Sequence, residues 1–185
     1  IMSSDWSSDV CSSDLAMAYS SENNLLFVGY SNGNIDILKN NQVYNLSDIK
    51  RTTIAGSKSV NHILFIDEFA YLSCGFGIVV INLEKLEVKD TYYIGDLGTQ
   101  LHVNQLVFDN NYLYAATNQG IYIADYMNPN LVDYSNWEMI TSIPGYTSKF
   151  NTLQVNNGQI IVNRVNESSN DMIYIYNGVS WEIFK

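Results

Sequence analysis

The chain has 185 residues, with 9 Lys and Arg against 19 Asp and Glu and a formal net charge of −10. This length suffices for one domain with a buried core. The acidic balance argues against a nucleic-acid partner, because proteins that bind the phosphate backbone concentrate Lys and Arg on one face. Apolar runs stay well short of the roughly eighteen residues that cross a bilayer, so the sequence predicts no membrane-spanning segment.

The first fifteen residues differ from everything that follows. The tripeptide Ser-Ser-Asp occurs three times in them and nowhere later. Residues 5–15, DWSSDVCSSDL, agree at every position with the translation of a DNA string that resembles a widely used sequencing adapter. We therefore predict that residues 1–15 are a non-native, adapter-derived or disordered N-terminal segment and that the native sequence begins near Ala16. Without this segment the net charge is −7.

After residue 15 the sequence consists of four copies of one pattern. The first contains AMAYSSENNLLFVGYSNGNIDIL, in which short apolar runs are separated by a polar turn and a glycine-containing turn. VNHILFIDEFAYLSCGFGIVVINL and VNQLVFDNNYLYAATNQGIYIADY repeat these runs, and the fourth copy is looser because NESSND interrupts it. We place the copies at residues 16–59, 60–102, 103–149 and 150–185.

Glycines and small residues mark equivalent positions in the first three copies. The second glycine follows the first by 44 residues, the third follows the second by 43, and a small residue stands four positions before each. The glycines are expected to supply the positive φ that a tight hairpin needs. These repeat positions, to which we assign a structural role, are Gly33, Gly77 and Gly120 and the smaller-residue set Gly29, Ser73 and Ala116.

Each copy predicts four short strands. Apolar residues alternate with period two, as in half-buried strands, and a polar turn precedes a fourth run in each copy. The fourth runs are QVYNL, EVKDTYYI, WEMI and SWEIF. Before the last of them, Asn177 and Gly178 form a strong hairpin signal.

Four antiparallel strands per 40–45 residues is typical of β-propeller blades. A parallel β-helix would need a shorter period, and a βαβ fold would need helical patterns that the sequence lacks. The predicted fold class is therefore all-β, a β-propeller fragment with about four four-stranded blades. We expect an open arc of a seven-bladed ring, and because such an arc leaves blade faces uncovered, we expect the isolated chain to aggregate or oligomerise.

The sequence offers little for catalysis or metal binding. His62 and His102 occupy different places in the repeat, and neither belongs to a zinc-binding or nucleophile motif. Cys74 is the one cysteine outside the first fifteen residues and is expected to be buried. We predict no catalytic residues, no metal site, no cofactor and no enzymatic activity, although carboxylates from separate blades could still serve a glycosidase.

Asn61, Asn104 and Asn151 are the most regular polar feature, each following the apolar residue that opens a copy. Such amides can bond neighbouring backbone groups, or they can form a ring that grips a sugar or peptide. Their recurrence favours the structural interpretation, and they remain the candidate ligand-binding residues. A group of aromatic residues could stack on sugars or pack between blades: Tyr92, Tyr93, Tyr126, Tyr134, Trp137, Tyr146 and Trp181.

The stretch LYAATNQGIYIAD resembles the propeller repeats of sensor ectodomains in bacterial two-component regulators, whose core is Leu-Trp-x-Gly-Thr-x-x-Gly-Leu. Tyr114 replaces the Trp, Ala116 takes the small position, and Thr117 and Gly120 are kept. The stretches FVGYSNGNIDIL, AYLSCGFGIVVINLEKLEVKDTYYIG and YAATNQGIYIA are similar to the amino-terminal propeller of the PorZ family, a surface component of the type IX secretion system. This second likeness runs from Ala16 to at least Trp137.

The PorZ resemblance implies a non-enzymatic scaffold at the bacterial cell surface or outer membrane. Members act in an attachment complex with a sortase-like subunit and outer-membrane proteins, and assist delivery of anionic lipopolysaccharide to secreted cargo. Full members contain two propellers, so this chain would be part of an exported protein. The alternatives are a periplasmic ligand-sensing propeller of a two-component regulator and a carbohydrate-binding or carbohydrate-active propeller.

Overall fold

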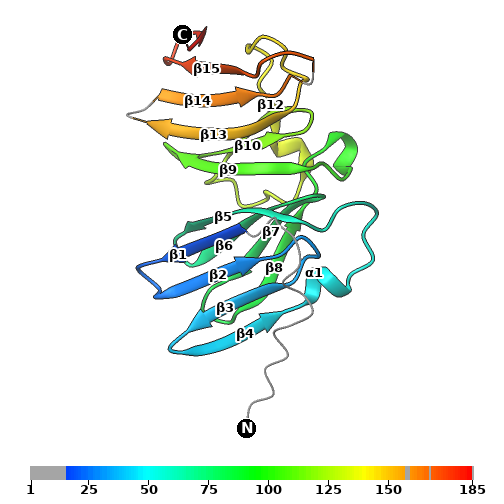
Figure 1. Cartoon of the computed structure of the whole chain (residues 1–185), viewed down its shortest axis with the longest axis vertical. Coiled ribbons are helices and arrows are strands. Elements are labelled where there is room, and N and C mark those ends of the chain that lie inside the picture. The colour runs from blue at the N-terminus through cyan, green and yellow to red at the C-terminus, as the bar shows by residue number, and fades with distance from the viewer. Residues whose placement is uncertain (1–15, 157–158, 167, 185) are drawn as a thin grey trace.

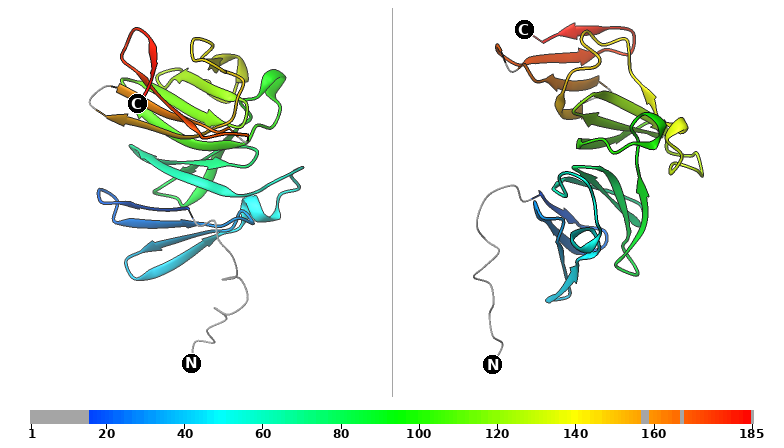
Figure 2. Two further views of the ribbon diagram at one scale, coloured as in Figure 1. Left: turned by 45° about the horizontal axis from the view of Figure 1, so that its top comes forward. Right: turned by 90° about the vertical axis from the view of Figure 1, so that its right-hand side faces the viewer.

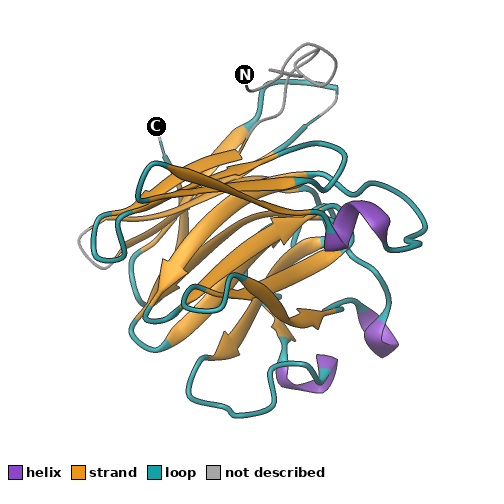
Figure 3. Ribbon diagram, turned by 90° about the horizontal axis from the view of Figure 1, so that it is seen from below, coloured by secondary structure: helices purple, strands orange, loops and turns teal. Residues whose placement is uncertain are grey.

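The computed structural model describes residues 16–156, 159–166 and 168–184 (Figure 1). The predicted adapter-derived segment, residues 1–15, lies outside them. The described residues form four antiparallel sheets, each built from four strands that are consecutive in the chain. Most of the secondary structure consists of β-strands, with short helical turns between some of them (Figure 3). The predicted all-β fold with four-stranded blades is confirmed, whereas the size of the complete ring stays a prediction.

The sheets follow the sequence repeat. The first contains β1 (Ala16–Ser20), β2 (Leu25–Gly29), β3 (Ile35–Lys39) and β4 (Gln42–Leu46). The second contains β5 (Val60–Ile66), β6 (Phe69–Cys74), β7 (Gly77–Asn82) and β8 (Glu87–Tyr92). The third contains β9 (Val103–Asp109), β10 (Tyr112–Thr117), β11 (Gly120–Asp125) and β12 (Glu138–Met139). The fourth contains β13 (Phe150–Asn156), β14 (Gln159–Arg164), β15 (Met172–Tyr176) and β16 (Trp181–Ile183).

The first strands of successive sheets lie against one another. β1 contacts β5, β5 contacts β9, and β9 contacts β13. The sheets succeed one another along an arc, with the first and fourth at its two ends (Figure 2). Short helical turns lie in the connections: α1 (Asp48–Arg51), η1 (Asp96–Gly98) and η2 (Tyr134–Asn136).

Hydrophobic cores lie between neighbouring sheets. Because side chains of a strand alternate between its two faces, one strand can serve two cores. In β6, Ala70 and Leu72 pack against the first sheet, whereas Tyr71 packs against the third. This explains why FAYLSC and GIVVIN are mostly apolar rather than alternating: both faces of the second sheet are covered. A third core joins the third and fourth sheets.

The fourth strands lie where they were predicted, with one marked shortening. β12 has two residues, because the long connection before it is anchored into the second core. The Trp137 indole is buried, lies 6.4 Å from the Tyr92 ring, and donates a hydrogen bond to the Leu131 carbonyl at 3.0 Å. The chain can therefore join the ladder of β11 only at Glu138.

The repeated small residues stand where the backbones approach closely. Gly120 has φ +114°, and a Cβ there would lie 2.6 Å from the Tyr146 carbonyl oxygen, so no other residue fits without distortion. A Cβ at Gly29 would lie 2.5 Å from Val60 Cγ1 of the next sheet. At the equivalent positions, Ser73 and Ala116 are fully buried.

Candidate functional site

The three repeated asparagines occupy β-bulges at the beginning of the inner strands. In β5, Val60 pairs with Cys74 and His62 with Ser73, so Asn61 is the extra residue. The same irregularity leaves out Asn104 in β9 and Asn151 in β13. A bulge redirects the side chain of the extra residue relative to the regular pleat of the strand. The equivalent position of the first copy is Leu15, outside the described residues.

Two of these amides cross to the next sheet. Asn61 Nδ2 donates to the Val103 carbonyl at 2.6 Å, and Asn104 Nδ2 donates to the Phe150 carbonyl at 2.8 Å. Val103 and Phe150 each open the following inner strand. Asn61 and Asn104 therefore each tie their own sheet to the backbone of the next one. The sequence suggested that the amides bond backbone nearby, but their partners lie more than forty residues away.

Further polar side chains join this row of amides. His102 Nε2 lies 3.0 Å from Asn61 Nδ2, and Asn118 Oδ1 accepts from Asn104 Nδ2 at 3.1 Å. Both amide hydrogens of Asn61 and of Asn104 thus have partners within the protein. A ligand that needed these donors would have to displace bonds that hold the sheets together.

The third amide, Asn151, has different surroundings. Its Oδ1 accepts from Asn163 Nδ2 at 2.9 Å, and Asn163 also donates to Asp171 Oδ2 at 2.8 Å. Asp171 accepts from the Asn166 backbone N–H as well, and these two bonds lower the pKa of its carboxyl. Asn151 and Asp171 are exposed. Of the candidate ligand-binding residues, Asn151 is the one most open to a solvent-borne partner, and that role stays a prediction.

Burial lowers the pKa of both histidines, and the nearby Lys149 cation adds to the effect on His102. A neutral His102 can accept from Asn61 through Nε2. His62 Nδ1 is buried and has no hydrogen-bond partner, and neither has the Ser73 Oγ of its cross-strand partner. In the third sheet, Gln105 stands at the position of the repeat that His62 occupies in the second sheet. Its Oε1 accepts a hydrogen bond from the Leu153 backbone N–H of the fourth sheet at 3.0 Å.

Replacing His62 with glutamine is expected to raise the free energy of unfolding by about 1 kcal/mol, because Gln can bond the next sheet as Gln105 does and an unpartnered buried nitrogen is removed. Ser73→Ala introduces the residue found at the equivalent position of the third sheet, Ala116, and is also expected to raise the free energy of unfolding. Equilibrium urea denaturation measures both changes. Gln105→Ala is the opposite control, since it leaves the buried Leu153 N–H unbonded, and a stability gain in that variant would contradict the interpretation.

The histidines also predict a dependence of stability on pH. Their pKa values in the folded state lie below the ordinary value of about 6.5 for the unfolded chain. The unfolded chain therefore binds protons more readily, so the free energy of unfolding should fall as the pH drops from about 7.5 through 6.5, and level off below the folded-state pKa values. Urea midpoints at pH 7.5 and 5.5 measure this. In the double variant His62→Gln, His102→Gln, the urea midpoints at the two pH values should lie much closer together. If their separation stayed the same as in the wild type, titrating groups other than these histidines would be responsible.

The other positions singled out in the sequence are Cys74 and a group of aromatic residues. In the described ranges, no three His, Cys, Asp or Glu side chains come together as metal ligands. Cys74 is buried, and burial raises the pKa of its thiol. No helix among the described residues has the length and apolarity to span a bilayer. Of the aromatic residues, Tyr92 and Trp137 are buried in the second core, while Tyr134 and Tyr146 are exposed.

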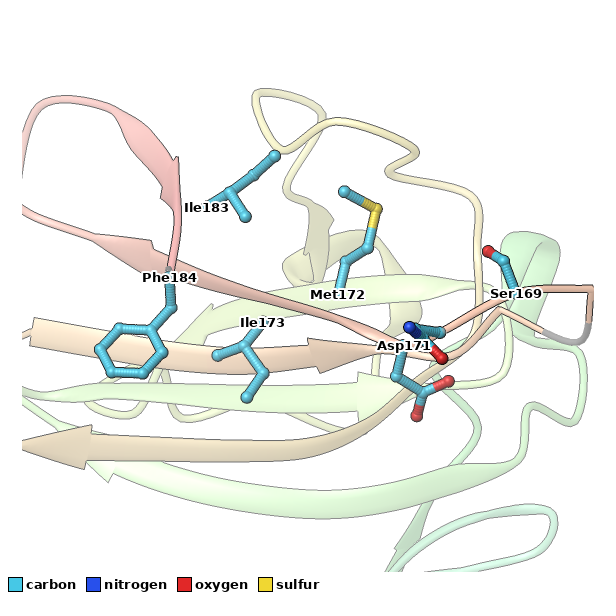
Figure 4. A pocket seen from close by; sticks show the side chains of 7 residues that line it. Ser169, Asp171, Met172, Ile173, Ile183 and Phe184 are labelled. Atoms are coloured by element: carbon cyan, nitrogen blue, oxygen red, sulfur yellow. The ribbon is translucent and has the colours of Figure 1, made fainter.

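Two shallow hollows lie at the ends of the arc. One, of about 520 Å³, is lined by residues of β15 and the segments beside it, including Ile173, Ile183 and Phe184 (Figure 4). The other, of about 200 Å³, lies on the first sheet and includes Tyr19 and Leu38. Neither of these two hollows is lined by Asn61, Asn104 or Asn151.

Comparisons with known proteins agree with this architecture. Residues 11–138 match the family described as TSS9, PorZ, N-terminal beta-propeller domain. No curated protein matches the sequence. Among solved structures, PorZ of Porphyromonas gingivalis, described as an essential bacterial surface component of the type IX secretion system, is similar with a TM-score of 0.74 and 24% identity. That match covers 91% of this chain and 22% of PorZ.

Extracellular domains from B. thetaiotaomicron show the same fold. BT4673 matches with a TM-score of 0.63 and 16% identity, covering 92% of this chain and 21% of that one. BT3049, described as part of a putative hybrid two-component system, matches with a TM-score of 0.62 and 12% identity, and the match covers 94% of this chain and 25% of that one. The chain thus spans about a fifth to a quarter of these proteins. Since the family match extends over more than two thirds of the sequence, the chain belongs to the PorZ N-terminal β-propeller family of the type IX secretion system.

Proposed function

We propose that this chain is part of a non-enzymatic scaffold and binding propeller in a cell-surface type IX secretion attachment complex, where it assists delivery of anionic lipopolysaccharide to secreted cargo. The observation that carries the proposal is the match of residues 11–138 to the PorZ propeller family. The engagement of Asn61 and Asn104 in bonds between sheets supports a scaffold, because these residues are occupied in holding blades together.

An anionic ligand must overcome the negative charge of the chain. Because the net charge is −10, the chain as a whole repels anionic lipopolysaccharide at long range. Contact therefore has to occur at a local cationic segment. Three of the nine cationic residues, Lys50, Arg51 and Lys58, fall within nine positions around α1. Lys58 Nζ donates to the Lys50 carbonyl at 2.7 Å, which fixes the returning loop beside the helix. We expect lipopolysaccharide to contact this segment.

The direct test uses the immobilised chain in two assays. Detergent-solubilised outer membranes of P. gingivalis are passed over it and type IX secretion subunits are quantified by mass spectrometry, and purified anionic lipopolysaccharide is measured separately by surface plasmon resonance. The double variant Lys50→Glu, Arg51→Glu should bind lipopolysaccharide at least about 10-fold more weakly. Lys85→Glu, on an exposed turn beside Glu87, is the matched control and should bind unchanged. If the immobilised chain captured no secretion subunits and bound no lipopolysaccharide, the proposal would be refuted.

A ligand-sensing propeller is the second candidate, favoured by the similarity to the extracellular domains BT4673 and BT3049. A sensor should bind a small solute rather than secretion subunits. A thermal-shift screen of the chain with mono- and oligosaccharides separates the two functions: a saturable stabilisation by one sugar, without capture of secretion subunits, supports the sensor and contradicts the scaffold.

A further inference from the structure

The connection between β11 and β12 distinguishes the third sheet from the other three. In those three sheets the third and fourth strands are joined by two to four residues, at 40–41, 83–86 and 177–180. In the third sheet the connection extends over residues 126–137. Surface connections held by a rigid scaffold are frequent carriers of binding residues, and this one exceeds what the repeat requires.

The connection is held to the second core at three points. At its beginning, the centroid of the Tyr126 ring lies 5.0 Å from that of Phe108, edge to face. Leu131 is buried in its middle, and the Leu131 carbonyl accepts the hydrogen bond from the buried Trp137 indole at its end. A connection fixed in this way presents its other side chains in one arrangement, which lowers the entropy cost of binding a partner.

Apolar side chains on this connection and on η1 are nevertheless exposed. Val132 is 50% and Tyr134 38% exposed, and η2, which contains Tyr134, contacts η1. A Cβ at Gly98 of η1 would lie 3.4 Å from Tyr134 Cδ1. Leu97 of η1 is 83% exposed and has φ +57°, in the left-handed region, so neither burial nor backbone preference explains a leucine there.

The η1–η2 surface, as we name it, consists of Asp96, Leu97, Asp133 and Tyr134. It lies where the second and third sheets meet, because η1 joins β8 to β9 and η2 contacts η1. Both faces of the second and third sheets are covered by their neighbours. The exposure of this surface therefore does not depend on the faces of the first and last sheets.

A carboxylate precedes each of the two exposed apolar side chains. Asp96 stands before Leu97, and Asp133 stands before Tyr134. Residues 90–148 contain six Asp and Glu but no Lys or Arg. The surface is therefore apolar at its centre and surrounded by negative charge that no cation of the same stretch neutralises.

Hydrogen bonds and charge fix the two carboxylates in place. Asp133 accepts from the Ser135 backbone N–H and hydroxyl, and these bonds lower the pKa of its carboxyl and keep it ionised. Burial, and after it the Asp96 carboxylate, raise the pKa of Tyr122 in β11. Asp96 is therefore close enough to the third sheet to act together with Asp133.

We infer that the η1–η2 surface binds a cationic segment of a partner protein, in which an apolar side chain stands beside Lys or Arg. Leu97 and Tyr134 pack on the apolar side chain, and the Asp96 and Asp133 carboxylates pair with the neighbouring cations. Charge complementarity selects this partner, because an anionic ligand such as lipopolysaccharide is repelled from a stretch without Lys or Arg. The inference concerns a surface other than the cationic segment around α1 and does not rest on lipopolysaccharide delivery.

The probe for this surface is a short fluorescein-labelled peptide in which Lys and Leu alternate, titrated with the chain and followed by fluorescence anisotropy. Saturable binding is expected. Two reference peptides separate the contributions, one with Ser in place of each Leu and one with Glu in place of each Lys. Each should bind at least about 10-fold more weakly, since it lacks either the apolar or the charged contact.

The double variant Leu97→Ala, Tyr134→Ala should weaken binding of the Lys–Leu peptide at least about 10-fold. Both side chains are exposed, so the urea midpoint should stay unchanged, which separates a loss of binding from a loss of the fold. Val43→Ala, Tyr44→Ala is the matched control, because these two exposed side chains lie on β4 of the first sheet. Its binding should change less than about 2-fold.

A second double variant, Asp96→Asn, Asp133→Asn, tests the charges and should weaken binding at least about 5-fold. Asparagine keeps an acceptor for the Ser135 backbone N–H, so the turn is expected to remain folded. Glu84→Gln, Glu87→Gln changes the net charge by the same amount on the exposed β7–β8 turn. Binding in this control should change less than about 2-fold, because its charges are far enough from the peptide to be screened.

Hydrogen exchange of the wild-type chain, saturated with the Lys–Leu peptide, locates the contact without any variant. Protection is expected in residues 95–99 and 131–136. Protection confined to the first or fourth sheet would overturn the inference, as would the absence of saturable binding at about 1 mM peptide. Equal losses in the Asp96→Asn, Asp133→Asn variant and its control would show only a general attraction to an acidic chain, and would overturn it as well.

Discussion

Leu113→Ala is expected to lower the free energy of unfolding by about 2–5 kcal/mol, because it removes a fully buried side chain from the core between the second and third sheets and leaves a cavity there. Leu113 lies in β10, between Phe108 of β9 and Ala124 of β11. Both neighbouring strands hold this position in the pleat, so the core can collapse only partly around the smaller residue. Equilibrium urea denaturation measures the loss.

Leu97→Ala provides the matched control, since the same atoms are removed from a side chain that is 83% exposed. Its effect should stay within about 0.5 kcal/mol of zero. Similar losses in the two variants would mean that Leu113 does not lie in a core between sheets, and would contradict the side-by-side packing of the blades.

Asn104→Ala is expected to lower the free energy of unfolding by about 1–3 kcal/mol, because the variant leaves the Phe150 carbonyl without its amide donor where the third and fourth sheets meet. The loss should be accompanied by faster hydrogen exchange in β13, the strand that Asn104 ties to its neighbour. Urea denaturation and mass-spectrometric hydrogen exchange measure the two effects.

Asn151→Ala is the control for that experiment. Asn151 occupies the same bulge position, but its Oδ1 accepts a hydrogen bond from the half-buried Asn163 of its own sheet. A change of no more than about 0.5 kcal/mol is expected. If Asn151→Ala and Asn104→Ala were equally destabilising, the cross-sheet bond could not be the reason for the asparagine at this position.

The sequence was sufficient for the fold class, because the propeller signal is local and repeated. Apolar alternation located the strands, and the nearly equal spacing of Gly33, Gly77 and Gly120 defined the repeat without any knowledge of contacts between sheets. QVYNL coincides with β4, and EVKDTYYI overruns β8 by two residues. The shortening of β12 could not be predicted, since it depends on Trp137 being anchored against Tyr92 of another sheet.

The candidate site was less accessible to prediction. The recurrence of Asn61 and Asn104 was visible, but the partners of their amides were not, because a bulge and the spacing of neighbouring sheets decide where the side chains point. His102 was missed as a partner of Asn61 for the same reason: it lies in a connection, outside the equivalent repeat positions. The unequal surroundings of Asn151 likewise follow from Asn163 and Asp171, which the repeat pattern does not single out.

A crystal structure of the chain tests the central claim most directly, namely that four consecutive sheets pack side by side as propeller blades. We predict that β1, β5, β9 and β13 lie next to one another in that order, and that the Asn61 and Asn104 amides donate to the Val103 and Phe150 carbonyls. Helices packed across the repeats, or sheets that share no common row of inner strands, would contradict the account.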